Sequence, residues 1–212
     1  MERLTLIISL FVLFGSGHLF SQQSNYQKFG VETSKGEPSG LKVGQEAPDF
    51  SLEDQDGNTF HLASETEDAP VVIFFYRGYW CPVCNKYLNR YADSLSMVTE
   101  RGAKVIAITP ESYENVEKTR SKTGVDVRVL SDKNQQVMKK YKVAFHVSDA
   151  YQQKIQKMLS ADIARTNNQK DAQLPVPATY IINTDRQIVA RQFDVNYKNR
   201  ASVSWMLENL PK

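Results

Sequence analysis

An apolar run followed closely by the only two cysteines of the chain constrains its fold most. Residues 71–76 are Val, Val, Ile, Phe, Phe and Tyr, and an unbroken β-branched and aromatic run of this length predicts a strand covered on both faces. From Pro82 to Val98 the apolar residues recur at helical spacing, and Gly102 is placed to end that helix. Cys81 is therefore expected where a buried strand passes into a helix.

This position predicts different chemistry for Cys81 and Cys84. The first turn of a helix has backbone N–H groups without intrahelical partners and a partial positive charge, so it stabilises an anion. Helix N-termini and Cys-X-X-Cys settings lower a cysteine pKa from ~8.5 to ~3.5–7.5. We therefore expect Cys81 as the reactive thiolate and Cys84, deeper in the helix, as a protonated thiol. Such a pair is suited to cycling between dithiol and disulfide, with Cys81 attacking an oxidised partner and Cys84 releasing it.

Other uses of a Cys-X-X-Cys pair compete with this interpretation. A structural zinc site needs four ligands, but the chain has no second cysteine pair, and His61 and His146 lie in unrelated segments. Covalent haem attachment needs a histidine directly after the second cysteine, where Asn85 stands. We therefore expect no metal and no cofactor. A structural disulfide stays open because exported proteins commonly have them, although closing so short a loop removes little chain entropy.

The N-terminal residues indicate export. A short start with one arginine is followed by a mostly apolar run at 4–14 and then by small and polar residues, which is the layout of a secretory signal peptide. The run is short for a membrane span. We expect residues 1–21 to be a cleaved signal peptide, 22–40 a flexible lead-in and 41–212 the folded domain of a secreted or periplasmic protein. Only an uncleaved segment would anchor the chain in a membrane.

The charge and the remaining hydrophobic pattern predict an α/β domain without a nucleic-acid surface. The 26 basic and 24 acidic residues are interspersed and give a net charge of +2, which is not the footprint of a nucleic-acid binder. Residues 50–62 alternate apolar and polar residues around Asp56-Gly57, which indicates a β-hairpin. Strands that alternate with helices imply crossover connections and a sheet flanked by helices. The expected strands are 71–76, 104–109, 125–130, 178–182 and 187–193, and the expected later helices are 111–123, 134–141 and 200–210.

A segment between 143 and 174 interrupts this alternation. Its apolar residues Tyr151, Ile155, Met158, Leu159 and Ile163 stand at helical spacing among charged and Gln-rich neighbours. The pattern predicts a helical insertion. Its role, as a lid or partner surface or as a packing helix, stays open.

Three segments carry a resemblance to a known family. Residues 43–50 (VGQEAPDF), the strand leading into WCPVC at 80–84, and residues 176–182 (VPATYII) resemble the thioredoxin fold as elaborated in alkyl hydroperoxide reductases and thiol-specific antioxidants, the peroxiredoxins and their relatives. The resemblance extends over roughly residues 41–210. It implies a thioredoxin-like fold with a central mixed sheet, and a thiol-dependent oxidoreductase in which Cys81 is the nucleophile and Cys84 resolves the intermediate.

The resemblance and the local sequence both suggest supporting residues. In the superfamily a proline before the late strand is cis and lies against the redox cysteines, which corresponds to Pro177. The arginine that supports the reactive sulfur from near the final helix corresponds to Arg200. From the local sequence, Arg77 is placed either to favour a thiolate or to lie in solvent. Tyr79 and Trp80 are placed either to form a flat docking platform for a partner or to cover the start of the helix.

Two departures from the family pattern affect the expected substrate. Peroxiredoxins usually carry a proline seven positions and a threonine three positions before the peroxidatic cysteine, whereas this chain has Phe74 and Gly78 there. In the family that threonine helps to bind and polarise the peroxide. The Cys81–Cys84 spacing is, in contrast, that of thiol-disulfide exchangers.

Three functions therefore remain open. In the leading hypothesis a hydroperoxide oxidises Cys81, and an external thiol reductant such as a thioredoxin-like donor regenerates the pair. In the second, the substrate is a disulfide-bearing protein. In the third, the chain is a non-catalytic binding module with a structural disulfide.

Overall fold

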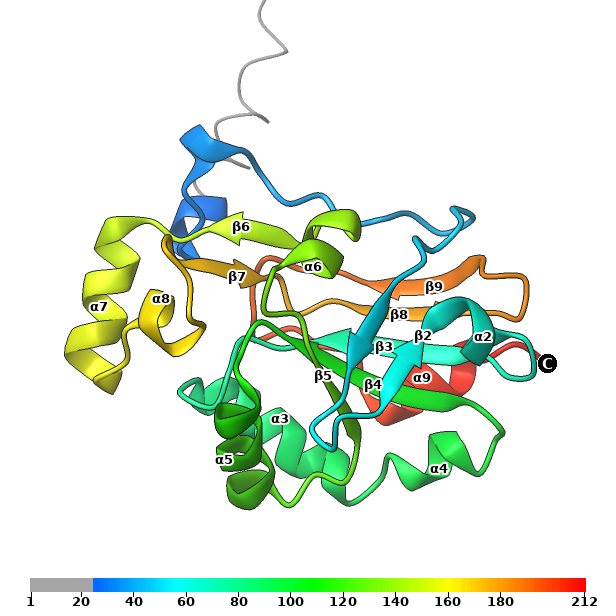
Figure 1. Ribbon diagram of the computed structural model, residues 1–212. Coiled ribbons are helices and arrows are strands. Elements are labelled where there is room, and N and C mark those ends of the chain that lie inside the picture. The colour runs from blue at the N-terminus through cyan, green and yellow to red at the C-terminus, as the bar shows by residue number, and fades with distance from the viewer. Residues whose placement is uncertain (1–24) are drawn as a thin grey trace, which may run out of the picture.

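A computed structural model describes residues 25–212 as a five-stranded mixed sheet flanked by helices (Figure 1). The strand order is β5-β4-β3-β8-β9, in which β3, β4 and β5 are parallel, β8 is antiparallel to β3, and β9 is antiparallel to β8. The predicted α/β fold with a central mixed sheet is confirmed. The predicted signal peptide, residues 1–21, lies outside the described residues. The strands are β3 (Val71–Phe75), β4 (Lys104–Thr109), β5 (Arg128–Ser131), β8 (Thr179–Ile182) and β9 (Ile188–Gln192).

Strand β3 lies at the centre of the sheet because its side chains are apolar on both faces. Every residue of β3 is buried, as its unbroken apolar run predicts. Val71 pairs with Lys104 of β4 on one side and with Ile182 of β8 on the other, and both registers continue along the strand. The residues that follow β3 therefore leave the sheet from its most rigidly held strand.

The helix after β3 is shorter than the sequence predicts. α3 (Pro82–Ala92) is followed by a separate short α4 (Ser96–Thr99), although the pattern predicts one helix up to Gly102. The hydroxyl of Ser94 donates to the Arg90 carbonyl at 3.1 Å, a side-chain bond that competes with regular helical geometry. In Figure 1, α3 and α5 (Tyr113–Thr123) lie side by side below the sheet, and α4 contacts α9 (Val203–Asn209).

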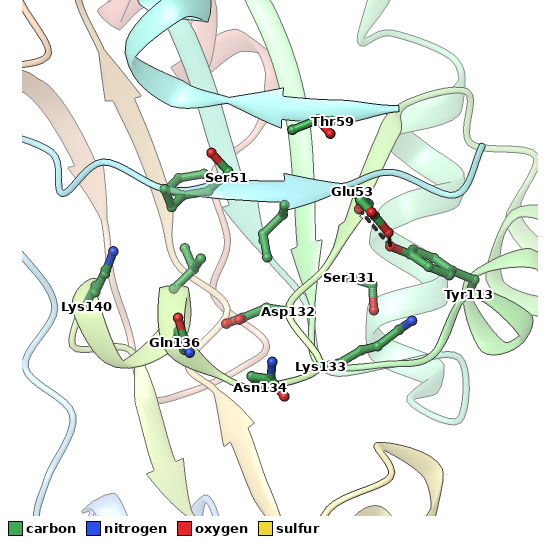
Figure 2. A pocket seen from close by; sticks show the side chains of 13 residues that line it. Ser51, Glu53, Thr59, Tyr113, Ser131, Asp132, Lys133, Asn134, Gln136 and Lys140 are labelled. Carbon is green, nitrogen blue, oxygen red and sulfur yellow. Dashed lines mark hydrogen bonds between the residues drawn. The ribbon is translucent and has the colours of Figure 1, made fainter. Parts of the chain in front are cut away.

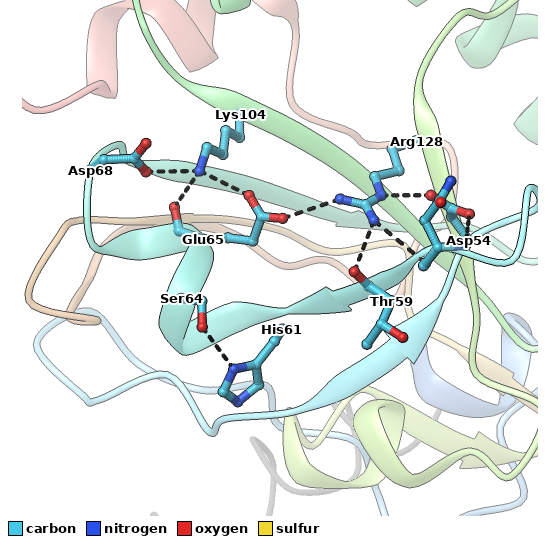
Figure 3. Close-up of polar contacts among 9 residues, drawn as sticks. Asp54, Thr59, His61, Ser64, Glu65, Asp68, Lys104 and Arg128 are labelled. Atoms are coloured by element: carbon cyan, nitrogen blue, oxygen red, sulfur yellow. Dashed lines mark hydrogen bonds and ion pairs between the residues drawn. The ribbon is translucent and has the colours of Figure 1, made fainter.

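The predicted hairpin is present as β1 (Ser51–Glu53) and β2 (Thr59–His61), which pair antiparallel. Ion pairs connect it and the following α2 (Leu62–Thr66) to the sheet (Figure 3). Arg128 of β5 contacts Asp54 at 2.9 Å and Glu65 at 3.1 Å. Lys104 of β4 contacts Glu65 at 2.8 Å. Two neighbouring strands thus share the Glu65 carboxylate of α2, and Arg128 also holds the hairpin through Asp54.

The predicted helical insertion consists of α7 (Asp149–Leu159) and α8 (Ile163–Thr166). A small antiparallel pair, β6 (Ala144–His146) and β7 (Gln173–Pro175), closes its base, and α6 (Gln136–Lys140) precedes it. Tyr151 and Ile155 are the buried residues of α7. The insertion therefore turns one face of α7 towards the body of the domain.

The described part of the predicted flexible lead-in, residues 25–40, lies against the domain and includes a short 3-10 helix, η1 (Thr33–Lys35). Val31 is completely buried and forms a bridge with Val147. The N–H of Glu32 donates to the His146 carbonyl at 2.8 Å, and the Gly30 carbonyl accepts from Ser148 N–H at 2.9 Å. This differs from the expected flexibility because one apolar side chain and paired backbone groups anchor an otherwise polar segment.

The last helix begins later than the sequence predicts. Ser202 accepts a hydrogen bond from the N–H of Trp205 at 3.0 Å and so caps α9. Arg200, which the sequence places inside a helix over 200–210, therefore lies in the loop before it. Within residues 25–212, every helix is too short or too polar to cross a membrane.

Candidate active site

Cys81 directly precedes the first turn of α3. Its backbone is extended, with φ −87° and ψ 104°, and Pro82 takes a position in the first turn, where a missing N–H costs no helical hydrogen bond. The Cys81 sulfur accepts a hydrogen bond from the backbone N–H of Cys84 at 3.2 Å. The sulfur thus lies where the oxygen of a Ser, Thr, Asp or Asn side chain usually caps a helix, and where the helix dipole favours a negative charge.

Arg77 lies between the end of β3 and Cys81 in the sequence, and its guanidinium contacts the Cys81 sulfur. Nη2 donates to Sγ of Cys81 at 3.1 Å, and Nη1 donates to the hydroxyl of Tyr151 at 3.0 Å. The guanidinium also lies 3.7 Å from the ring centre of Tyr197 and 5.4 Å from that of Trp80. Arg77 is only 3% exposed, so its charge is desolvated and acts strongly on the sulfur.

Arg200 contacts the second sulfur rather than the first. Its Nη2 donates to Sγ of Cys84 at 3.2 Å, and its Nε donates to the carbonyl of Tyr197 at 3.1 Å. The resemblance implies that Arg200 supports the reactive sulfur, whereas in this fold each sulfur has an arginine of its own. Two cations therefore face two neighbouring thiols.

The surroundings shift the pKa values of the two cysteines in opposite directions. Burial raises the pKa of Cys84, but the hydrogen bond from the Cys81 thiol and the charges of Arg200 and Arg77 outweigh it and hold that pKa well below its usual value. Burial, the hydrogen bond to Cys84 and the negative charge of Cys84 raise the pKa of Cys81 well above its usual value. The sequence predicts the anion on Cys81 and an ordinary thiol at Cys84. The structure differs because the hydrogen bond from the Cys81 thiol and the charge of Arg200 favour the anion on Cys84.

Cys81 is completely buried, at 0% exposure, whereas the sequence interpretation requires a sulfur that solvent can reach. A cavity of about 210 Å³ adjoins the site and is lined by Arg77, Pro82, Val83, Tyr151, Lys154, Ile155, Met158, Leu159 and Tyr197. Arg77 contacts both the cavity and the sulfur. A substrate in the cavity therefore lies beside the guanidinium that contacts Cys81.

Trp80 is buried rather than displayed. It is 6% exposed, so it covers the start of α3 and does not form a flat docking platform. Tyr79 is half-buried, and the ammonium of Lys118 lies 5.4 Å from its ring centre. Of the two alternatives that the sequence leaves open for this aromatic pair, the structure therefore favours the covering role.

The prediction of a cis peptide bond before Pro177 is wrong. No cis peptide bond occurs in residues 25–212, so the Val176–Pro177 bond is trans, the form that X–Pro bonds generally favour. The N–H of Ala178 donates to the Val176 carbonyl at 2.7 Å. This bond closes a three-residue turn around Pro177, whose ring holds φ near the value that an inverse γ-turn needs.

The sequence analysis does not predict three residues of the site. Tyr151 belongs to the insertion, Tyr197 lies in the loop before Arg200, and Glu111 follows β4. The sequence predicts Glu111 at the start of an exposed helix, but its side chain is completely buried. The helical spacing of Tyr151 predicts an inward-facing position without indicating what it contacts. For Tyr197 and Glu111 the sequence contains no comparable signal.

Neither the larger cavity nor His61 is part of the dithiol site. A larger cavity of about 430 Å³ lies between the hairpin and α6 (Figure 2), and neither cysteine lines it. His61, considered above as a zinc ligand, is instead bonded to Asp49 at 2.8 Å and Ser64 at 3.0 Å. Within the described range, no group of three or more His, Cys, Asp or Glu side chains is placed to hold a metal ion.

The fold and the site together define a class. A mixed sheet whose central strand passes into a helix that begins at a Cys-X-X-Cys pair is a thioredoxin-like thiol oxidoreductase fold. The AhpC/TSA family model matches residues 43–191. The chain therefore belongs to the AhpC/TSA family and is a peroxiredoxin-like thiol peroxidase or thiol oxidoreductase.

Individual comparisons agree with this family. A candidate peroxiredoxin of Mycobacterium tuberculosis is 28% identical over 155 residues, which are 73% of this chain and 87% of the relative. A peroxiredoxin-like protein from Aquifex aeolicus has a similar structure, with a TM-score of 0.61 and 18% identity over 81% of this chain and 90% of that one. A candidate protein disulfide isomerase from Bacteroides thetaiotaomicron reaches a TM-score of 0.53, with 18% identity over 80% and 91% of the two chains. The two structural similarities, each at 18% identity, show a shared fold.

Proposed function

We propose that this protein reduces hydroperoxides through a Cys81–Cys84 dithiol/disulfide cycle. The observation that carries the proposal is the contact of the Arg77 guanidinium with the Cys81 sulfur at 3.1 Å, at the start of a helix whose Cys84 N–H points to the same sulfur. A buried cation and a helix N-terminus both stabilise the thiolate form, which is the nucleophilic one.

The first step is attack on the peroxide. The proton that the two sulfurs share moves from Cys81 to Cys84, and the Cys81 thiolate attacks the terminal peroxide oxygen. The O–O bond breaks, the alkoxide leaves and takes up a proton to become an alcohol, and Cys81 becomes a sulfenic acid. Arg77 and the hydroxyl of Tyr151 lie 3.0 Å apart beside this sulfur. They supply polar contacts where the family threonine is replaced by Gly78.

The second step joins the two sulfurs. The Cys84 thiol gives up its proton and its sulfur attacks Cys81. The S–O bond breaks, and the hydroxide that leaves takes up this proton and becomes water. Cys84 sits one helical turn from Cys81, and its N–H already contacts the Cys81 sulfur. An external dithiol donor of the thioredoxin kind then returns two electrons by thiol-disulfide exchange, which restores both thiols.

A protein thiol-disulfide exchanger is the second candidate. Two observations favour it. The pair has the Cys-X-X-Cys spacing of exchangers, and both sulfurs carry an arginine contact, at 3.1 Å and 3.2 Å. In this version Cys81 attacks a protein disulfide, forms a mixed disulfide and is released by Cys84.

Stopped-flow kinetics separates the two candidates. Reduced protein is mixed with hydrogen peroxide or with an oxidised model protein disulfide, and oxidation is followed by tryptophan fluorescence, because Trp80 contacts Arg77. We expect a second-order rate constant for peroxide at least ~100-fold above that of a free cysteine thiolate, lost in Cys81→Ser. A peroxide rate no faster than free thiolate, with fast reaction on the disulfide, would leave the exchanger. No rate enhancement with either oxidant would leave the binding module.

We also propose that the protein acts outside the cytoplasm. The proposal rests on the apolar run at 4–14 and the polar residues that follow it. The mass of the mature protein purified from its own cells tests this. We expect a loss of about 21 residues from the N-terminus, and an intact N-terminus would contradict it.

A further inference from the structure

The structure contains a buried carboxyl group beside the dithiol that the steps above do not use. Glu111 follows β4, ahead of α5, and is 0% exposed. Its Oε1 accepts a hydrogen bond from the backbone N–H of Tyr79 at 2.9 Å. Its Oε2 is buried and has no hydrogen-bond partner among residues 25–212. A carboxylate held this way is costly to keep charged unless its surroundings provide a positive charge.

Gly78 is the residue that lets Glu111 approach the active-site loop. A Cβ atom at position 78 would lie 2.6 Å from Oε1 of Glu111 and 2.8 Å from Nε1 of Trp80, and Gly78 has φ +144°. Any side chain there would push the carboxyl group away. The loop between β3 and Cys81 is therefore shaped around this carboxyl group.

Three charged or titratable side chains from the surrounding elements interact with Glu111. Cys84 of α3 raises the pKa of Glu111 and Lys118 of α5 lowers it. The charge of Glu111 in turn raises the pKa of Tyr76, which follows β3. Burial has the largest effect and, with Cys84, raises the pKa of Glu111 to about 8. An anion on Cys84 and an anion on Glu111 therefore oppose each other.

We propose that Glu111 exchanges the site's negative charge with the dithiol, so that the anion is on sulfur in the reduced protein and on Glu111 in the disulfide form. The site then contains one buried anion in both states. This inference rests on the proposed Cys81–Cys84 cycle, and it adds a proton-storing role for a positioning residue that does not contact the substrate.

Reduction of the disulfide by a dithiol donor leaves the net charge of the site unchanged in this proposal. A dithiol donor gives two electrons and two protons and becomes a disulfide. The electrons break the Cys81–Cys84 bond, one proton stays on the cysteine pair, and the other protonates the carboxylate of Glu111. The negative charge lost by Glu111 appears on the Cys84 sulfur, so the net charge of the site is unchanged.

Proton uptake on reduction tests the proposal. The disulfide is reduced with a chemical dithiol in weakly buffered solution at several pH values, and protons are counted with an indicator dye. We expect the wild type to take up as much as one proton more per disulfide than Glu111→Gln, over the pH range in which Glu111 is ionised in the disulfide form and protonated in the reduced form. Glu117→Gln changes an exposed glutamate of the neighbouring α5 that is paired with Arg120, and it should match the wild type. Equal uptake in all three proteins would overturn the proposal.

Infrared difference spectroscopy of the wild type decides the matter if Glu111→Gln does not fold. The reduced-minus-oxidised spectrum should gain the carbonyl stretch of one protonated carboxylic acid, and its absence would contradict the proposal. Failure here is distinguishable from failure of the proposed function. Fast peroxide reduction with no carboxyl signal removes only the Glu111 inference, whereas a carboxyl signal with no reaction with peroxide removes only the peroxidase.

Discussion

At the scale of single residues, the chemistry depends on how firmly Arg77 is held. Its guanidinium donates to a sulfur and to a tyrosine hydroxyl and lies against the Tyr197 ring. Each of these contacts uses a different edge or face of the same planar group, which a lysine ammonium does not provide. The hydrogen bond from the Arg77 guanidinium to the Cys81 sulfur involves a charged donor and is buried. It is therefore stronger than a hydrogen bond between neutral groups.

Replacing Arg77 with methionine tests this contact. The charge of Arg77 lowers the pKa of both cysteines, so Arg77→Met should raise the pH at which the pair becomes reactive. A hydrogen bond to a charged group is worth about 1.5–3 kcal/mol, which corresponds to a roughly 10- to 100-fold slower alkylation near neutrality. Arg90→Met, an exposed change on α3, should leave the pH profile of iodoacetamide alkylation unchanged. Equal profiles for the two variants would contradict the assigned contact.

Glu111 should make the stability of the reduced protein depend on pH. Its pKa is raised from 4.5 to about 8, so between these values the native state holds a proton that the unfolded state has released. The free energy of unfolding therefore falls as the pH rises from 4.5 to about 8 and levels off above. We expect Glu111→Gln to flatten this slope, a difference of roughly 2–4 kcal/mol across the range. Urea unfolding under reducing conditions at a series of pH values measures it. Parallel curves for the two proteins would be inconsistent with a buried acidic Glu111.

At the scale of elements, the site joins parts that are far apart in the sequence. The end of β3 supplies Arg77, the start of α3 supplies both cysteines, and α7 of the insertion supplies Tyr151. The lead-in packs on the same insertion through Val31. The insertion is therefore a support for the active-site arginine as well as a packing element.

Two glycines of the lead-in provide a matched test of this support. A Cβ at Gly30 would lie 2.5 Å from the ring Cγ of Tyr151, whereas a Cβ at Gly36 would meet no atom within 4 Å. Both residues have positive φ, +93° and +100°, so alanine costs about 1–2 kcal/mol of backbone strain at each site. Gly30→Ala should cost ~1–3 kcal/mol more through overpacking. It should also slow alkylation of Cys81, because a displaced Tyr151 no longer holds Arg77 against the sulfur. Equal destabilisation of the two variants would exclude the proposed coupling.

At the scale of the whole molecule, local pattern predicts the elements and tertiary packing decides the site. The apolar run of β3, the alternation around Gly57 and the spacing of Tyr151 and Ile155 predict strands, hairpin and insertion, because burial periodicity follows directly from the residues. The position of Cys81 at a helix start follows in the same way. Sequence alone therefore predicts the fold and the position of Cys81 at the start of a helix.

The features that the sequence does not predict depend on contacts between segments that are distant in the chain. Glu111 looks like the start of a polar helix, and only the fold brings it under Gly78. Arg200 follows from the resemblance, but its choice of Cys84 over Cys81 depends on where the loop before α9 lies. The bond before Pro177 is trans, although the resemblance implies cis, and the local sequence does not distinguish the two isomers. Long-range packing also orders the lead-in, which composition describes as polar.

The central claim is that Cys81 and Cys84 form one redox site, and a single-turnover experiment tests it most directly. Reduced protein receives one equivalent of hydrogen peroxide, free thiols are counted, and the peptides are identified by mass spectrometry. We expect both thiols to be lost together as a disulfide between Cys81 and Cys84 of the same chain, and Cys84→Ser to stop at a sulfenic acid on Cys81. Two free thiols that remain after the turnover, or a sulfenic acid on Cys84, would contradict the claim.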